Sequence, residues 1–463
     1  ATPCSNCRRR PWCSATPRPC CSSSAVNCAA RGWEPRPPWR PEGPAMGPGQ
    51  GSPLGDAKAF PPSRSASLPE ALGLQSFRQR PPWLNGDLQT LRDTLRPVPL
   101  PPESGSRLEI SVPPAAPASN PSATEARADA GCDGLTGGGR AAAVDRLLAF
   151  VDSPLGEAPE PLGLVVLMHG LGGSSDREGL RRMGLTLQSA GFAVLRLNMR
   201  GAGPGRPLAR GTDAARCNSD LLPALRRARA LADGLAAGGR PLFGMGISLG
   251  GTKLLNALVA ELHEQAAAGL ERPLLDGLVC ISSPLDLEVC SRQIARPRNR
   301  VYERWLLKRL LAQTVADPFG LNPAEQRVLT GGGPGGPLRS IRAFDAAITA
   351  PRWGYDSVDS YYRAASPLPR LLALAEPGPR PSHILLPPAL ILHAADDPWV
   401  PVRSTERLAA SALAVERGGP WQVLITPKGG HNGFHAACDP PAGLNGNWGD
   451  RLTARWFRRL AGR

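Results

Sequence analysis

Short apolar runs alternate with longer helical segments from about residue 146 to the end of the chain. Each run is bounded by Gly, Pro or Ser and is apolar at consecutive positions, as in strands that are buried on both faces. Alternation of this kind is typical of βαβ units around a parallel sheet, so we predict an α/β fold with a mostly parallel sheet flanked by helices. The expected strands are residues 164–168, 193–198, 242–246, 278–282 and 389–393, and the expected helices are 177–190, 217–237, 250–264 and 450–460.

Three stretches depart from this alternation. Residues 1–76 are rich in Pro, Ser, Gly and Arg without helical or strand periodicity, which favours a disordered extension. Residues 113–140 are also of low complexity, and we expect them to form a flexible insert between two neighbouring strands. Residues 288–375 are too long for one crossover and have a helical, Arg-rich centre, so we expect a cap over the sheet edge. The folded domain is therefore predicted to span residues 77–463.

Six of the 11 cysteines lie in the first 28 residues. Cys4 and Cys7 have the CxxC spacing of a zinc site, but no second pair follows to complete four ligands, so we predict no metal site there. Arg and Pro interrupt the places where a secretory signal needs an apolar segment. Because the first methionine is Met46, we interpret residues 1–45 as an upstream extension without a folded role.

The formal net charge is +15, and nearly all of the positive charge is arginine. The arginines are scattered along the chain, whereas a nucleic-acid interface usually gathers them into clusters with aromatic residues. We therefore expect a solvated basic surface and no nucleic-acid partner. The sequence contains no apolar run long enough for a bilayer-spanning helix, and we expect a cytoplasmic protein.

A GxSxG pattern follows one of the expected strands directly. In PLFGMGISLGG, residues 241–251, an apolar run leads into Ser248, and the amphipathic segment 252–264 comes next. Small residues around the serine allow a sharp, strained turn that presents its hydroxyl above the sheet. An ordinary glycine-rich turn, such as a phosphate-binding loop, would show the same glycines. The flanking strand and helix favour Ser248 as a nucleophile.

A second glycine-rich turn supports this interpretation. The run LVVLMHGLGG, residues 164–173, is a buried strand that ends in a His-Gly turn. In enzymes with a strand-to-helix nucleophile turn, one backbone amide of the oxyanion hole comes from a loop of this kind. We predict that the backbone amides of Leu171 and Leu249 face the developing oxyanion. His169 itself is interpreted as a packing and turn residue.

A serine nucleophile needs a histidine base. His431 lies in the glycine-flanked stretch KGGHNGF after the strand-like residues 422–426, and His435 is the local alternative. The glycines on both sides of His431 suit a mobile catalytic loop, so we favour it as the base.

The histidine in turn needs a carboxylate that fixes its tautomer. Asp397 follows the expected strand 389–393 and lies between the serine and the histidine in the chain. Asp396 and Asp286 are the alternatives. The order Ser248, Asp397, His431 is the one expected of an α/β-hydrolase.

Several further motifs extend the pattern. They are PPWLNGDLQTL at 81–91, NMRG at 198–201, SSPLDL at 282–287, RVY at 300–302, IRAFD at 341–345, GY at 354–355, YY at 361–362 and GGHNGF at 429–434. With these motifs, the chain from about Phe77 to the C-terminus resembles the α/β-hydrolases and, within them, the YheT-like branch, which also includes animal membrane-associated lipid hydrolases. The sequence departs from that branch at Asp87, where histidine is usual, and by the insert at 113–140.

The resemblance implies an α/β-hydrolase fold with a helical cap and a serine hydrolase that acts on small-molecule or lipid esters. His431 would take the proton of Ser248, and water would later release the acyl-enzyme. No metal or organic cofactor is needed for this chemistry. The same triad serves thioesterases and peptidases, so these two activities remain alternatives. A binding or scaffold protein without turnover is the alternative from another class, and the filled triad disfavours it.

The expected cap contains a basic amphipathic segment, RVYERWLLKRLL, at residues 300–311. One interpretation is that this helix makes a peripheral contact with an anionic membrane or holds acyl chains. The other, which we favour, is that its apolar stripe of Val301, Tyr302, Trp305, Leu306 and Leu310 packs on the core. In that case the charges of Arg304, Lys308 and Arg309 are solvated.

Overall fold

The computed structural model describes residues 67–115, 144–156, 160–268, 273–332, 336–376, 386–440 and 446–463. All of them belong to one compact unit, Pro53–Arg463. Several predicted features lie outside the described residues: the CxxC sequence of Cys4 and Cys7, the upstream extension 1–45 and most of the insert between 113 and 140.

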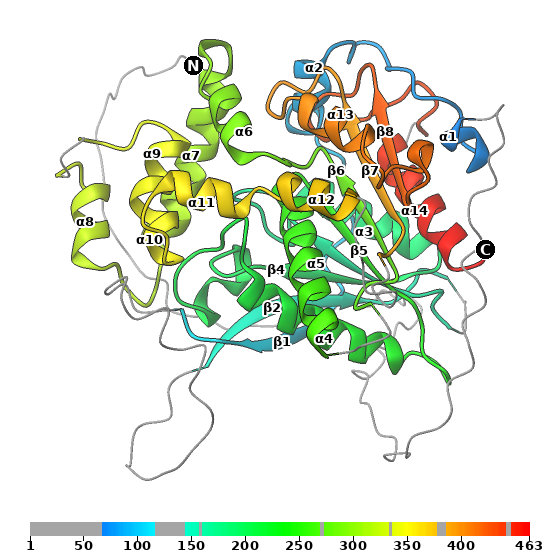
Figure 1. Ribbon diagram of the computed structural model, residues 1–463, viewed down its shortest axis with the longest axis horizontal. Coiled ribbons are helices and arrows are strands. Elements are labelled where there is room, and N and C mark those ends of the chain that lie inside the picture. Colours follow the sequence, from blue (N-terminus) through cyan, green and yellow to red (C-terminus); the bar gives the residue numbers. More distant parts are fainter. Residues whose placement is uncertain are drawn as a thin grey trace, which may run out of the picture. The chain divides into compact units, whose positions relative to one another are not determined.

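One sheet of eight strands organises the described chain (Figure 1). The strand order is β1-β2-β4-β3-β5-β6-β7-β8, and every pair from β4 to β8 is parallel. The predicted mostly parallel sheet is thereby confirmed. The strands are β1 (Ser106–Val112), β2 (Asp145–Asp152), β3 (Leu164–Met168), β4 (Ala193–Asn198), β5 (Leu242–Ile247), β6 (Gly277–Ile281), β7 (Ala389–Ala394) and β8 (Trp421–Thr426).

The sequence analysis expected strands on either side of residues 113–140 but gave no residue ranges for them. β1 pairs with β2 antiparallel, with Val112 opposite Asp145, and β2 pairs antiparallel with β4. Arg107 and Glu109 interrupt the apolar residues of β1, whereas residues 147–151 of β2 do form a continuous apolar run. The low-complexity stretch 113–140 does connect two paired neighbouring strands, as predicted.

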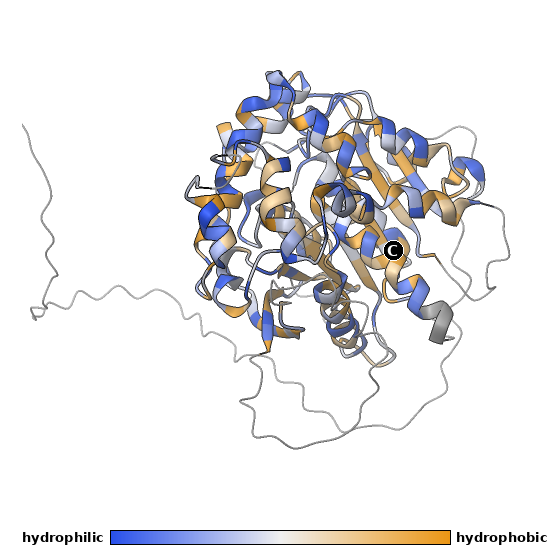
Figure 2. Ribbon diagram, turned by 60° about the vertical axis from the view of Figure 1, so that its left-hand side comes forward, coloured by the Kyte–Doolittle hydropathy of each residue, from blue (hydrophilic) through white to orange (hydrophobic). Residues whose placement is uncertain are grey.

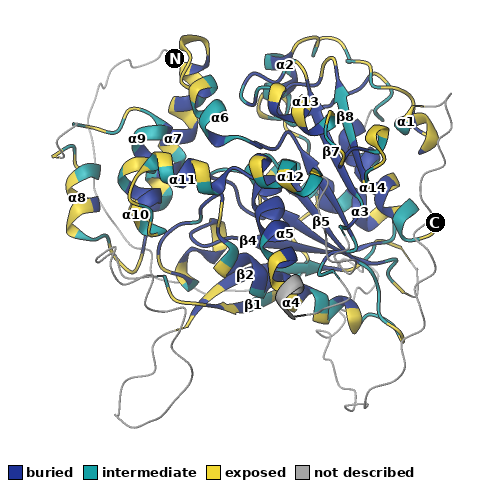
Figure 3. Cartoon of the chain, viewed as in Figure 1, coloured by how far each residue is buried: buried dark blue, intermediate teal, exposed yellow. Residues whose placement is uncertain are grey.

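Helices cover both faces of the sheet. Alternate residues of β3 point to opposite faces: Val165 and Leu167 belong to the apolar cluster with α3 and α14, whereas Val166 belongs to the cluster with α4 and α5. Figure 2 shows apolar residues along the strands, and Figure 3 shows the same strands as buried. These helices are α3 (Glu178–Ser189), α4 (Asn218–Asp233), α5 (Leu249–Ala268) and α14 (Trp448–Leu460).

The segment between β6 and β7 folds into helices, most of which lie to the left of these strands in Figure 1. Exposed residues gather on the outer ones, such as α8 in Figure 3. An aliphatic and aromatic cluster that includes Leu306, Leu310 and Phe344 holds α7 against α9. The helices are α6 (Leu287–Ile294), η4 (Pro297–Asn299), α7 (Arg300–Val315), α8 (Pro323–Leu329), α9 (Ile341–Phe344), the π-helical turn η5 (Asp345–Thr349), α10 (Ala350–Arg352), α11 (Val358–Ala365) and α12 (Leu368–Ala375). We call α6 to α12 the cap.

The remaining helices lie at the ends of the strands or before the sheet. They are α1 (Leu68–Ala71), α2 (Gly86–Leu95), η3 (Gly203–Leu208), α13 (Arg403–Ala409) and η6 (Val415–Arg417). Asn85 caps α2, because its side chain accepts a hydrogen bond from the amide of Leu88 at 2.8 Å.

Two expectations need correction. The ordered chain begins before residue 77, since Leu72 and Leu74 are buried in the apolar cluster with α14; residues 67–76 therefore belong to the fold and not to the extension. The apolar stripe expected on α7 is also divided. Leu306 and Leu310 are buried, whereas Val301 is 76% and Trp305 45% exposed, because only one side of the helix packs against the rest of the cap.

Candidate active site

Ser248 stands at the turn between β5 and α5. Its φ is +53°, a left-handed conformation that is strained for a residue other than glycine, as in a nucleophile turn. The turn is tight on both sides. A Cβ on Gly246 would lie 2.3 Å from the amide nitrogen of Gly251, and one on Gly250 would lie 2.3 Å from the carbonyl oxygen of Met168. Only glycine fits at these two positions.

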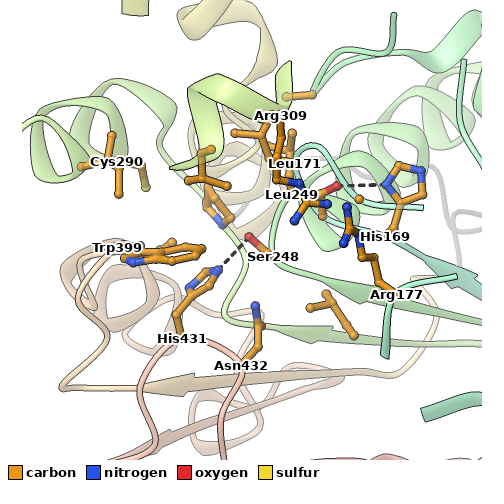
Figure 4. A pocket seen from close by; sticks show the side chains of 18 of the residues that line it. His169, Leu171, Arg177, Ser248, Leu249, Cys290, Arg309, Trp399, His431 and Asn432 are labelled. Carbon is orange, nitrogen blue, oxygen red and sulfur yellow. Dashed lines mark hydrogen bonds between the residues drawn. The ribbon is translucent and has the colours of Figure 1, made fainter. Parts of the chain in front are cut away.

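The three side chains predicted as a triad meet at the carboxyl ends of the parallel strands. His431 Nε2 lies 2.9 Å from Ser248 Oγ (Figure 4). His431 Nδ1 lies 2.8 Å from Asp397 Oδ2. With Nδ1–H donating to the carboxylate, Nε2 is free to accept the serine proton. The three residues come from the ends of β5 and β7 and from the loop after β8.

Asp397 is buried and ionised. Burial alone would raise the pKa of its carboxyl, but the charge and hydrogen bond of His431 oppose burial, and the net pKa is lowered from its ordinary value. Its second oxygen, Oδ1, accepts hydrogen bonds from the amides of Trp399 at 2.8 Å and Val400 at 2.9 Å. These bonds fix the carboxylate toward the histidine.

The loop that carries His431 is held by residues far away in the chain. Its amide donates to Thr90 Oγ1 at 2.8 Å, and the next amide, of Asn432, donates to Ser282 Oγ at 3.2 Å. The ring of Trp399 lies against the imidazole, with centroids 4.5 Å apart. The motif at 81–91, which contains Thr90, thus supports the histidine loop, a role that the sequence analysis did not assign.

The alternatives for base and acid are engaged elsewhere. His435 Nε2 lies 3.0 Å from Asp93 Oδ1. Asp396 accepts from the amide of Gly430 at 2.9 Å, and Asp286 accepts from the amide of Val289 at 3.1 Å as the N-cap of α6. None of these three side chains has a hydrogen bond to Ser248 or His431 in the described chain.

The expected oxyanion amides lie on either side of the serine. Leu249 is the first residue of α5, and Leu171 belongs to the turn after β3. A Cβ on Gly170 would lie 3.1 Å from Ser248 Cβ, so this turn passes directly over the serine. No described residue accepts a hydrogen bond from either leucine amide, and Figure 4 shows both leucines beside Ser248.

His169 fixes the orientation of that turn. Its Nε2 accepts from the amide of Met199 at 3.2 Å, so its Nδ1–H donates to the carbonyl of Gly170 at 2.9 Å. Because the carbonyl and the amide of one trans peptide point in opposite directions, this bond directs the amide of Leu171 away from His169. Burial, with the charge of Lys253, lowers the pKa of His169 to about 4, so the ring is neutral, as a turn residue requires.

A cavity of about 370 Å³ opens beside Ser248 and extends under the cap. Most of its wall is apolar, which suits an acyl chain or another apolar group. Residues of the cap supply much of this wall: Leu287, Ile294, Leu306, Leu310, Ile341 and Phe344.

Among the residues that the structure describes, neither a metal site nor a membrane-spanning helix is present. No group of His, Cys, Asp or Glu among them is arranged to hold a metal ion. None of the helices formed by these residues has both the length and the apolar character required to cross a membrane.

Comparison with known proteins agrees with the fold. A sequence model of the alpha/beta hydrolase family matches residues 165–444. YheT of Escherichia coli (strain K12) is 32% identical over 200 residues, which cover 42% of this chain and 50% of that protein.

Two eukaryotic relatives align over longer stretches. Medium-chain fatty acid ethyl ester synthase/esterase 2 of Saccharomyces cerevisiae is 27% identical over 332 residues, 67% of this chain and 65% of that protein. Phospholipase ABHD3 of Homo sapiens is 25% identical over 274 residues, 58% of each chain. The chain thus spans between 50% and 65% of the length of these three relatives. They support the YheT-like branch that the motifs indicated.

Proposed function

Because the chain belongs to the alpha/beta hydrolase family, we propose that it is a serine hydrolase that cleaves carboxylic esters. Ser248 is the nucleophile, His431 the general base and acid, and Asp397 the carboxylate that orients the histidine. The observation that carries the proposal is the continuous hydrogen-bond chain from Ser248 Oγ through both nitrogens of His431 to Asp397.

The reaction proceeds in two halves. Ser248 Oγ attacks the ester carbonyl carbon while its proton passes to His431 Nε2, and the amides of Leu171 and Leu249 stabilise the oxyanion. The alcohol leaves with the proton from His431, and the acyl group stays on Ser248. Water then attacks the acyl-enzyme, again with His431 as base, and releases the carboxylic acid.

The proposed substrates are small esters and acyl lipids. The apolar wall of the cavity favours an acyl chain. The printed names of two relatives describe a medium-chain fatty acid ethyl ester esterase and a phospholipase, which supports this substrate class.

A fluorophosphonate probe tests the proposal, because it reacts only with an activated serine. We expect labelling of the wild type and of Cys290→Ser, whose thiol lines the same cavity, and no labelling of Ser248→Ala. Labelling that persists in Ser248→Ala, or its absence in the folded wild type, would contradict it. Turnover of p-nitrophenyl esters of graded chain length, beside matched thioesters, then separates esterase from thioesterase activity.

The exposed side of α7 supports a peripheral membrane contact of the same enzyme. Val301 and Trp305 are exposed there, next to the exposed cations Arg304 and Lys308. We expect the protein to sediment with vesicles that contain phosphatidylserine, and the variant Arg304→Gln/Lys308→Gln to sediment less. Sedimentation that is the same for both proteins would remove this part of the proposal.

A further inference from the structure

Each carboxylate that lines the cavity has a partner within the protein, whereas two of the arginines that line it form no ion pair among the described residues. Asp93 and Asp450 both pair with Arg182, Asp213 pairs with Lys253, and Asp345 accepts from the hydroxyls of Thr349 at 2.7 Å and Tyr362 at 2.8 Å.

Two arginines that line the same cavity, Arg177 and Arg309, have no such partner. Neither forms an ion pair with a carboxylate in the part of the chain that the structure describes. Arg177 precedes α3 and is exposed, and the charge of the neighbouring Asp176 acts on it without an ion pair. The wall therefore carries two cations that are not paired with a carboxylate of the described chain.

Arg309 is built into the wall of the cavity and is not a freely solvated charge, contrary to our expectation for this helix. Its guanidinium lies over the ring of Trp305, 4.6 Å from the centroid, and donates a hydrogen bond to the carbonyl of Gly172. Its Nε is buried and has no hydrogen-bond partner. A half-buried cation with an unsatisfied donor is costly unless an anion completes the site.

The two guanidinium groups act on each other. Burial lowers the pKa of Arg309 to about 10, and the nearby charge of Arg177 contributes to that decrease. Two like charges in one partly desolvated cavity favour the binding of an anion between them. Arginine is also the side chain that best matches the paired oxygens of a phosphate or carboxylate.

The position of this pair relates it to the reacting serine. Gly172, which Arg309 contacts, belongs to the same turn as the oxyanion residue Leu171. In Figure 4, both arginines lie on the opposite side of Ser248 from Trp399 and His431. An anion held by them would thus lie in the cavity of the triad and could be part of the same substrate molecule.

We propose that Arg177 and Arg309 form a subsite for an anionic group, a phosphate or a carboxylate, on the ester substrate. This inference rests on the proposed function, since it specifies which esters the triad receives. It predicts that an acyl ester with a phosphate on its alcohol is preferred over the same ester without one.

Matched lipids test the preference. Decanoylglycerol and decanoylglycerol phosphate share one acyl chain and differ only in the phosphate. We expect a higher kcat/KM for the phosphate. In Arg177→Gln/Arg309→Gln, we expect this value to fall about 30-fold for the phosphate and less than about threefold for the neutral ester, the effect of losing charge-assisted hydrogen bonds. Arg300→Gln, an exposed arginine on α7 that does not line the cavity, is the matched control.

A binding measurement keeps this test separate from the proposed function. The non-hydrolysable ether analogues of both lipids are titrated into the wild type, the double variant and the control by calorimetry. The subsite is supported if the wild type binds the phosphate analogue more tightly than the neutral one and the double variant does not. This result would hold even if no ester is hydrolysed. Inorganic phosphate and the matching ether carboxylate, used as competitors, distinguish a free ion from a tethered group. Equal affinities for charged and neutral analogues, or equal losses for both, would overturn the inference.

Discussion

The two walls of the cavity are built differently. On the sheet side, the groups of the triad are fixed by the backbone: amides hold Asp397, and amides of the His431 loop are anchored on Thr90 and Ser282. On the cap side, helices packed through aliphatic contacts carry Arg309 and the apolar lining. In the proposed function, the sheet side carries the reacting groups, and the cap contributes Arg309 and the apolar lining to the recognition of the substrate.

The largest effect that this division predicts is on the sheet side. Asp397→Asn removes the carboxylate that fixes the tautomer of His431, and we expect kcat to fall about 10⁴-fold in ester hydrolysis. Asp396→Asn, one residue away, is the control, because Asp396 contacts the backbone of Gly430 and not the imidazole. We expect it to lose less than about tenfold. If both variants lose activity equally, the carboxylate has been assigned wrongly.

The sheet side was also the part for which the sequence predicted site residues. Ser248, Asp397 and His431 each follow a short strand, so the strand pattern alone places them at one edge of the sheet. Arg177 and Arg309 could not be found in this way. Arg177 immediately precedes α3 and Arg309 lies in α7, 132 positions further along the chain. What distinguishes them is that neither forms an ion pair with a carboxylate among the described residues, which only the packed structure shows.

The role of Thr90 and the bounds of β1 and β2 were not predicted. Thr90 lies in a motif that the sequence analysis had noted, but its partner, the amide of His431, is more than 300 residues away. Charged residues interrupt β1, and its antiparallel register with β2 depends on contacts across residues 113–140 that have no local signal.

Glycine substitutions compare the packing of the two sides. In Gly250→Ala, the new methyl group meets the carbonyl of Met168 at 2.3 Å, and the backbone there cannot yield, so we expect a loss of about 3 kcal/mol or more in the free energy of unfolding. In the cap, Gly354 has φ +73° with no atom near its Cβ position. Gly354→Ala should cost only about 1 kcal/mol, the strain of a left-handed alanine. Urea denaturation of both variants measures the difference, and equal losses would contradict it.

A change in pH also separates the sides, first through His169. The pKa of this histidine is about 4 in the folded protein and about 6.5 in an unfolded chain, so the unfolded chain binds a proton that the folded protein does not. As the pH falls from 6.5 to 4, this histidine should remove up to about 3 kcal/mol from the free energy of unfolding. In His169→Gln, the decrease over this range should be smaller by that amount. If the pH dependence measured by urea denaturation is the same in His169→Gln as in the wild type, His169 is not its cause.

Asp345 in the cap should act in the opposite direction, with a smaller effect. Burial raises the pKa of its carboxyl to about 6, against an ordinary value of 3.8, although hydroxyl groups of Thr349 and Tyr362 donate to it. The folded protein therefore holds a proton that the unfolded chain releases, and stability is lost as the pH rises from about 4 through 6. Because the carboxyl is partly open to the cavity, we expect about 1 kcal/mol. Asp345→Asn should be more stable than the wild type at pH 7 by this amount and equal to it at pH 4, whereas the exposed control Asp356→Asn should show neither change. If Asp345→Asn stabilises the protein equally at both pH values, the effect arises from packing and not from ionisation. The opposite pH dependences that we expect for His169 and Asp345 would then be contradicted.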